Sequence, residues 1–219
     1  MAALSVACAI ALEGQKKPMD PTRTIDLAAP NRTFVLGASI PVGIRYTNRS
    51  AVEIQFRDPR KTWEVQLSNG TVSLPFGKII RSVDNGIMSW SVEDAETIRL
   101  APNANFTFQY DAGKRWPEAF RPGRNGLQIK DLTSDAVTLE SKRIEVAVEF
   151  TADTVPALLA ILDDPEATPG SQQFAVQWLQ AVYPQHVTPA ATRAWWDSNR
   201  SSPAVAEAIA RINRDAAAQ

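Results

Sequence analysis

The chain has 219 residues, of which 44% are hydrophobic and 21% charged, and its formal net charge at pH 7 is −1. This composition is typical of a globular protein and excludes a disordered or fibrous chain. The near balance of 23 basic and 24 acidic residues disfavours a dedicated nucleic-acid binder, which carries a basic excess. Because the sequence has no run of about 18 apolar residues, we expect no membrane-spanning helix.

The counts of cysteine and histidine limit the chemistry further. Cys8 and His186 are the single residues of their types in the sequence. One cysteine excludes an intrachain disulfide, and one histidine excludes a multi-histidine metal site. We therefore expect neither a metal nor another cofactor.

The first residues read as a targeting segment. Residues 1–12 (MAALSVACAIAL) are apolar or small, and charge begins at Glu13. The run resembles the hydrophobic stretch of a secretory signal, although no Lys or Arg precedes it. We expect residues 1–22 to be a signal or anchor segment with a disordered polar connector, and the protein to be secreted or periplasmic. Two alternatives stay open, namely a lipid anchor at Cys8, as in a membrane-anchored lipoprotein, and a short buried helix.

Apolar and polar residues alternate repeatedly between residues 23 and 150, and turn residues such as Asn48–Ser50 and Ser68–Gly70 separate the runs. Period-two alternation predicts strands with one buried face. The segments concerned are 40–47, 52–57, 63–67, 106–110, 127–129 and 144–150. Two such antiparallel sheets facing each other form an all-β sandwich. Apolar residues within 72–92 favour further strands, but a covering loop stays open there.

Three stretches of this region carry a family resemblance. They are Thr33–Phe56 (TFVLGASIPVGIRYTNRSAVEIQF), Leu100–Asn103 before Phe106, and Arg121–Arg124 before Leu127. This pattern resembles bacterial immunoglobulin-like or fibronectin-III-like domains, with Asn103 in place of a turn glycine, a substitution that a left-handed turn tolerates. The Bacillus intracellular proteinase inhibitor is similar in the same pattern. The resemblance implies an immunoglobulin-like sandwich and keeps protease inhibition open, since many functions share this fold.

Residues 151–219 are predicted to be helical. Thr154, Thr188 and Ser202 are candidate N-caps, and Ser171–Val182 places Phe174, Trp178 and Val182 on one face. The segment resembles two HEAT-type repeats, which implies four helices docked on the sandwich and an α+β protein overall. Net charge supports this division, since residues 21–150 carry +2 and residues 151–219 carry −3.

The sequence offers little catalytic chemistry. His186 lies between two predicted helices, and no Gly-x-Ser-x-Gly motif supplies a nucleophile for it. The acidic pair Asp163–Asp164 and the group Glu93, Asp94 and Glu96 are better explained as solvated loop residues. Residues 131–135 lack the glycine and terminal glutamate of an EF-hand loop. We therefore expect a protein that is not an enzyme.

One loop combines cations with aromatic residues and is the predicted binding site. Its candidate residues are Lys114, Arg115, Trp116, Phe120, Arg121 and Arg124. Aromatic residues and arginine are enriched at interface hot spots, and loops on a rigid scaffold often bind partners. In the alternative interpretation the two aromatic side chains plug the core and the cations are only solvated. The adjacent Trp195 and Trp196 are a second candidate. They point to different sides of their helix, so one is expected in the core and the other docked against the sheet, while a partly exposed ring stays open.

These observations favour a non-catalytic secreted or envelope module that binds a protein or surface component. Two alternatives remain. The first is a proteinase inhibitor that uses a sandwich loop. The second is a carbohydrate-binding protein with exposed Trp side chains as stacking platforms.

Overall fold

The computed structural model describes residues 21–58, 63–67, 72–75, 79–84, 87–92, 97–131, 139–183, 185 and 187–218. Several predictions lie outside these residues. They are the signal or anchor segment with Cys8, the turn at 68–70, the acidic group at 93–96, part of 131–135, and His186.

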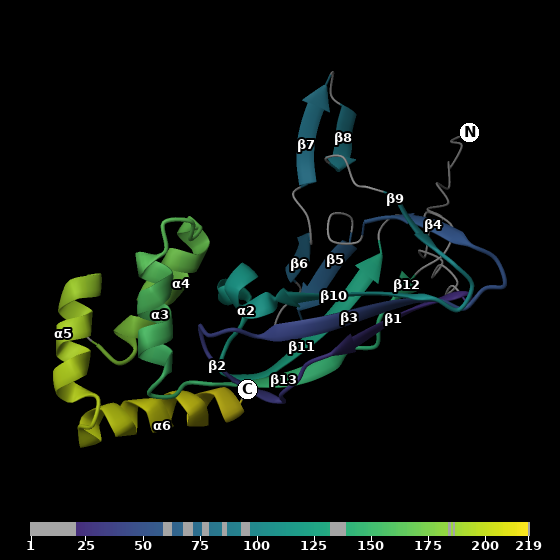
Figure 1. The fold of residues 1–219 in the computed structure, drawn as a ribbon. Coiled ribbons are helices and arrows are strands. Elements are labelled where there is room, and N and C mark those ends of the chain that lie inside the picture. Colours follow the sequence, from purple (N-terminus) through teal and green to yellow (C-terminus); the bar gives the residue numbers. More distant parts are fainter. Residues whose placement is uncertain are drawn as a thin grey trace, which may run out of the picture.

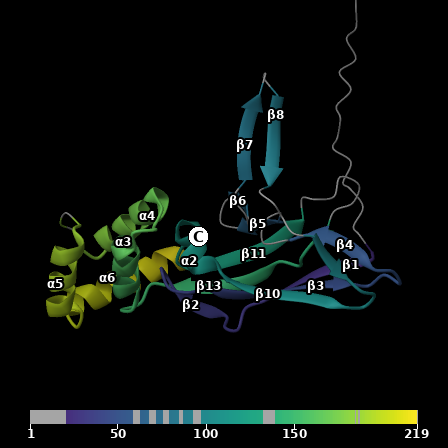
Figure 2. The same cartoon turned by 45° about the horizontal axis from the view of Figure 1, so that its top comes forward.

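Two larger sheets and two strand pairs make up the β part (Figures 1 and 2). The three-stranded antiparallel sheet has the order β1 (Arg23–Ala28), β3 (Pro41–Asn48) and β10 (Asn105–Asp111). The six-stranded sheet has the order β2 (Thr33–Val35), β13 (Ile144–Glu149), β11 (Gly123–Asp131), β5 (Trp63–Leu67) and β6 (Val72–Pro75), with β12 (Leu139–Glu140) also on β11. The pairs are β4 (Ile54–Arg57) with β9 (Thr97–Leu100) and β7 (Ile79–Asp84) with β8 (Ile87–Val92).

The strands agree with the alternation in the sequence, and one pairing differs from expectation. Residues 72–75, 79–84 and 87–92 are strands, and β7 and β8 project away from the larger sheets (Figure 1). Among the described strands, β2 and β13 pair in parallel and the other pairs are antiparallel. Backbone hydrogen bonds from Leu36 N to Glu149 O (2.9 Å) and from Ala147 N to Arg32 O (2.7 Å) extend this parallel pair. Because β2 has only three residues, its pairing depends on these distant partners.

The two larger sheets bury their apolar faces in one hydrophobic core. From β3 it contains Val42, Ile44 and Tyr46, each at most 2% exposed. Leu127 of β11 and Val148 of β13 join the same core. With its helices, the chain is therefore an α+β protein.

A buried asparagine closes the turn after β3. Asn48 is fully buried, and its side-chain amide donates to the carbonyls of Val52 (2.8 Å), Leu100 (3.0 Å) and Ala101 (3.1 Å). Its Oδ1 accepts from the Ser50 backbone N–H at 2.9 Å. The predicted Asn48–Ser50 turn is thus held by a side chain that imitates backbone hydrogen bonding. At the later turn Asn103 adopts a φ of 59°, which is the left-handed conformation expected there.

Helices form the carboxy-terminal part and one insertion between strands. They are α2 (Ala112–Arg115), the 3-10 turn η1 (Pro117–Ala119), α3 (Thr154–Asp163), α4 (Pro169–Gln180), α5 (Pro189–Asn199) and α6 (Pro203–Ala217). The N-caps at Thr188 and Ser202 are confirmed, since each side chain accepts from the backbone N–H three residues on. The cap at Thr154 is wrong by one position. Asp153 is the N-cap residue of α3, and the Thr154 hydroxyl accepts from the Thr151 N–H instead. None of the helices in the described ranges combines the length and apolar character needed to cross a bilayer.

The helices pack in two ways. Helix α3 packs against both α4 and α5, whereas α6 runs from α5 toward β11 (Figure 1). Trp196 is buried, and the Trp195 ring lies 5.1 Å from that of Tyr183. Trp196 is thus the core member of the pair, as expected for one of the two, and Trp195 is half-buried within the helical part. The expectation that the second ring docks on the sheet is wrong, because α3 lies between α5 and the sheets (Figure 1). The HEAT-type repeat stays a prediction.

A side-chain amide joins α6 to the residue that follows β13. The Asn213 side chain accepts from the Phe150 N–H at 3.0 Å and donates to the Phe150 carbonyl at 2.8 Å. Phe150 follows β13 and is fully buried. Both backbone groups at the end of the strand are thereby satisfied by one side chain of α6.

Replacement of the Asn213 amide should weaken the contact between α6 and Phe150 and destabilise the protein. We expect Asn213→Ala to lower the free energy of unfolding by about 1–3 kcal/mol, because two partly buried backbone groups lose their partner. Arg214→Ala, at the exposed neighbouring position, is the matched control and should change it by no more than about 0.5 kcal/mol. Urea denaturation followed by circular dichroism measures both. Equal effects of the two variants would contradict the stabilising role of the hydrogen bonds between Asn213 and Phe150.

Candidate binding pocket between the sheets and helices

The predicted binding loop is folded and anchored. Asp111 caps α2, since its carboxylate accepts from the Lys114 N–H at 3.0 Å and from the Ile40 N–H at 2.9 Å. Gly113 lies so close to the preceding turn that a Cβ there would be 2.2 Å from the Ala38 carbonyl oxygen. The loop is therefore packed tightly on residues 38–40.

The structure separates the six predicted binding residues into two groups. Lys114, Arg115, Arg121 and Arg124 are exposed. Trp116 is only 8% exposed and Phe120 only 1%. Both rings belong to the core, as in the alternative interpretation in which they plug it.

The Trp116 indole contacts an aromatic ring and a guanidinium group. The Tyr110 ring meets it edge-on with centroids 5.9 Å apart, and the Arg115 guanidinium lies 5.3 Å from the indole centroid. Burial raises the pKa of the Tyr110 phenol well above its usual range. Although Arg115 as a whole is exposed, partial desolvation of its guanidinium lowers the pKa of Arg115. The phenol is consequently neutral at all physiological pH values, and Arg115 acts as part of this packing.

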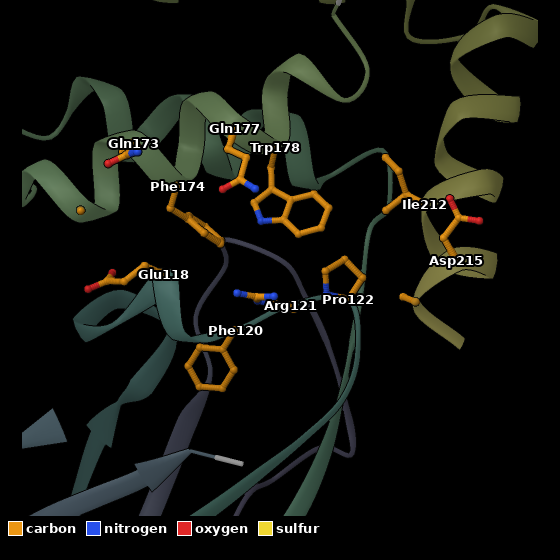
Figure 3. A pocket seen from close by; sticks show the side chains of 12 residues that line it. Glu118, Phe120, Arg121, Pro122, Gln173, Phe174, Gln177, Trp178, Ile212 and Asp215 are labelled. Carbon is orange, nitrogen blue, oxygen red and sulfur yellow. The ribbon is translucent and has the colours of Figure 1, made fainter. Parts of the chain in front are cut away.

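A pocket of about 410 Å³ lies where the loop after η1 meets α4 and α6 (Figure 3). Its apolar surface comes from Phe120, Pro122, Phe174, Trp178 and Ile212. Its polar groups are Glu118, Arg121, Gln173, Gln177 and Asp215. Of the predicted residues, Phe120 and Arg121 line this pocket, whereas Lys114 and Arg115 do not.

The position of Arg121 is set by a buried asparagine. Asn125 is 3% exposed, and its amide donates to the carbonyls of Arg121 (2.8 Å) and Gly123 (3.0 Å) while it accepts from the Arg121 N–H at 3.2 Å. Gly123 has a φ of +104°, a conformation that L side chains rarely adopt, and it packs against the backbone of Ala216 in α6. The backbone of Arg121 is therefore fixed while its side chain is exposed beside the pocket.

Helix α4 supplies the opposite wall. Thr168 caps it by accepting from the Ser171 N–H at 3.1 Å, and the Ser171 hydroxyl donates to Glu118 Oε2 at 3.1 Å. This bond places a carboxylate at the positive N-terminal end of the helix, where negative charge is favoured. Gln173 and Gln177 are exposed one turn apart, and the adjoining stripe holds Phe174 and Trp178. The centroid of the half-buried Trp178 ring lies 6.1 Å from that of Phe150, so the ring packs against the residue that follows β13.

A second groove continues from the pocket on the other side of Arg121. It has a volume of about 960 Å³ and shares Arg121, Pro122 and Ala216 with the first. It adds Arg124, Glu149 and Asn213. Arg121 and Arg124 are thus placed on one continuous hollowed surface along α6.

The pocket combines several kinds of polar group with an apolar lining. It brings together one guanidinium, two carboxylates and two primary amides around an apolar floor. Within the described ranges, no group of three or more His, Cys, Asp and Glu side chains is placed to hold a metal ion. Pockets with an apolar lining and a few polar groups are typical of ligand sites.

Sequence reasoning missed Gln173, Gln177 and Asp215. Their only signal is their position on the polar faces of amphipathic helices, which fits solvated residues equally well. They reach the pocket because α4 and α6 both fold back to the loop after η1.

The known proteins similar to this chain match it in part of the fold. No protein-family model matches the chain, and no curated protein matches it. Among solved structures, the sporulation control protein Spo0M from Bacillus subtilis is 9% identical over 64% of this chain and 56% of that chain, with a TM-score of 0.36. This chain therefore spans only about half the length of Spo0M.

Two further structures are similar at the same level. The CARDB domain of the PF1109 protein from Pyrococcus furiosus, solved in complex with di-metal ions, is 10% identical over 59% of this chain and 94% of that chain, with a TM-score of 0.30. A beta-glucosidase from Listeria innocua, solved with glucose, is 18% identical over 57% of this chain and 16% of that chain, with a TM-score of 0.32. None of them assigns an activity to this chain.

Proposed function

We propose that this protein is a non-catalytic binding module, in which an immunoglobulin-like sandwich and a HEAT-like helical unit together bind a protein or surface component. One observation carries the proposal: a pocket with mixed polar groups around an apolar floor lies where the loop after η1 meets α4 and α6. The apolar run at residues 1–12 supports a secreted or periplasmic location.

The structure bears differently on the two alternatives, a proteinase inhibitor and a carbohydrate-binding protein. The loop from residue 112 to 119 is helical and pinned by Asp111, which disfavours its use as an extended inhibitory loop in a protease cleft. Carbohydrate binding is favoured by one observation, since Trp178 is half-buried in the pocket beside Gln177. It is therefore the second candidate function.

Affinity capture tests the proposal. The bait is the full chain, and the source is the cell envelope and secreted fraction of the native organism. We expect Arg121→Ala/Gln177→Ala, which changes two exposed pocket residues, to lose a partner that the wild type retains. Lys114→Ala, on the same loop but outside the pocket, is the matched control and should retain it.

The opposite results are equally informative. Loss of the partner by the control variant alone would move the site to α2 and contradict the pocket assignment. Absence of any partner specific to the wild type, under low and moderate salt, would count against the interaction module.

A further inference from the structure

We infer that the pocket recognises an extended peptide segment that carries a carboxylate next to a bulky apolar side chain. This inference rests on the proposed function and names the chemistry of the partner. Three features of the pocket carry it: an arginine that forms no ion pair within the described residues, a pair of amides on α4, and an aromatic floor.

The charge of Arg121 favours an anionic ligand. Arg121 is the single cation among the residues that line the pocket, and no ion pair joins it to the part of the chain that the structure describes. Its guanidinium presents several N–H donors in a planar fork that matches a carboxylate. In Figure 3 its side chain lies between Glu118 on one side and Asp215 on the other.

The two carboxylates that line the pocket, those of Glu118 and Asp215, limit the kind of anion that Arg121 can bind. Glu118 already accepts from Ser171, while Asp215 has no partner in the described residues. Both carboxylates would repel a doubly charged anion such as phosphate more strongly than a singly charged carboxylate. A peptide supplies one carboxylate that can pair with Arg121. It also supplies backbone N–H groups that can donate hydrogen bonds to Asp215, so it complements both the positive and the negative side chain.

The amides on α4 suit an extended backbone. Gln173 and Gln177 are one helical turn apart and exposed, and each offers a donor and an acceptor. The same chemistry is used within the chain, where the Asn213 amide pairs with both the N–H and the carbonyl of Phe150. A peptide laid along α4 would pair with Gln173 and Gln177 in the same way.

The aromatic floor of the pocket, formed by Phe174 and Trp178, favours an apolar side chain in the ligand. Phe174 is 6% exposed and Trp178 is half-buried, so part of the Trp178 ring faces the pocket (Figure 3). A volume of about 410 Å³ admits a few residues of a peptide. An aromatic or aliphatic side chain beside the acid would cover the Trp178 ring and exclude water from the Arg121 contact.

Binding of defined peptides to the full chain tests the inference. The probes are fluorescent, acetylated hexapeptide amides that contain one Asp or Glu next to Phe, Trp or Leu, and each has a twin with Asn or Gln in place of the acid. For the wild type we expect the best acidic peptides to bind at least about tenfold more tightly than their amide twins, as charge-assisted hydrogen bonds require. Arg121→Gln should abolish that preference, and Gln177→Leu should weaken both members of a pair. Arg200→Gln, on the exposed end of α5, is the control and should change neither.

Several outcomes would overturn the inference. They are equal binding of acidic peptides and their twins, an acid preference that survives Arg121→Gln, and binding of neutral oligosaccharides in place of peptides. If the peptides fail while Arg121→Ala/Gln177→Ala still loses a captured partner, only the peptide chemistry is wrong. If both fail, the proposed function is wrong as well.

Discussion

Phe120→Ala is expected to lower the free energy of unfolding by about 3–5 kcal/mol. The ring is 1% exposed and belongs to the single core that the sheets and helices share. Removal of a buried ring loses its transfer free energy and leaves a cavity that the neighbours fill only in part. Since domains of this kind are stable by about 5–15 kcal/mol, the change is a large fraction of the total.

Urea denaturation followed by circular dichroism measures this loss, and Lys114→Ala provides the matched control on the same loop. Lys114 is exposed, so its truncation should stay within about 0.5 kcal/mol. A loss below about 1 kcal/mol for Phe120→Ala would mean that the ring is outside the core in solution. Phe120 would then return to the set of exposed binding residues.

The strands were predictable because most of them bury one face. Val42, Ile44 and Tyr46 alternate in β3 and are all buried, so a pattern of period two was enough to find the strand. Strand β11 runs from Gly123, four residues before the predicted start at Leu127. Its first residues are polar or glycine, and Asn125 is buried for its hydrogen bonds rather than for apolar contact. Alternation cannot reveal such a residue.

Strand pairing was less accessible than strand position. The parallel pair of β2 and β13 joins residues more than a hundred positions apart, and β2 is only three residues long. No local pattern encodes this pairing. It follows from where the chain must pass after β1 to reach the six-stranded sheet.

The candidate site was predicted in part, for a physical reason. Aromatic residues next to cations are equally suited to an interface and to a plugged loop, because burial of the ring is favourable in both. The sequence therefore identified the loop but could not separate the buried Phe120 from the exposed Arg121. The pocket itself depends on the contact of α6 with the sheet, through Asn213 at Phe150 and Ala216 at Gly123, and no local sequence pattern predicts these contacts.

The second large effect concerns a glycine of the same loop. Gly113→Ala should destabilise the protein by about 3 kcal/mol, the upper part of the range for overpacking. The added Cβ would lie 2.2 Å from the Ala38 carbonyl oxygen and 3.0 Å from the Ile40 backbone nitrogen. Both are backbone atoms, so relief requires α2 to move away from residues 38–40. Such a movement would strain the bonds of Asp111 to Ile40 and Lys114.

Gly43→Ala is the matched control for this substitution. At Gly43, in the middle of β3, the nearest atom to an added Cβ is the Ala28 carbonyl oxygen at 3.6 Å, an ordinary contact. The control should therefore leave stability unchanged or raise it by about 0.5 kcal/mol, since alanine restricts the unfolded chain more than glycine does. Thermal and urea unfolding of the two variants side by side measure the difference. Equal stability of the two would show that α2 is not seated on residues 38–40, and the fixed position of the loop beside the pocket would lose its support.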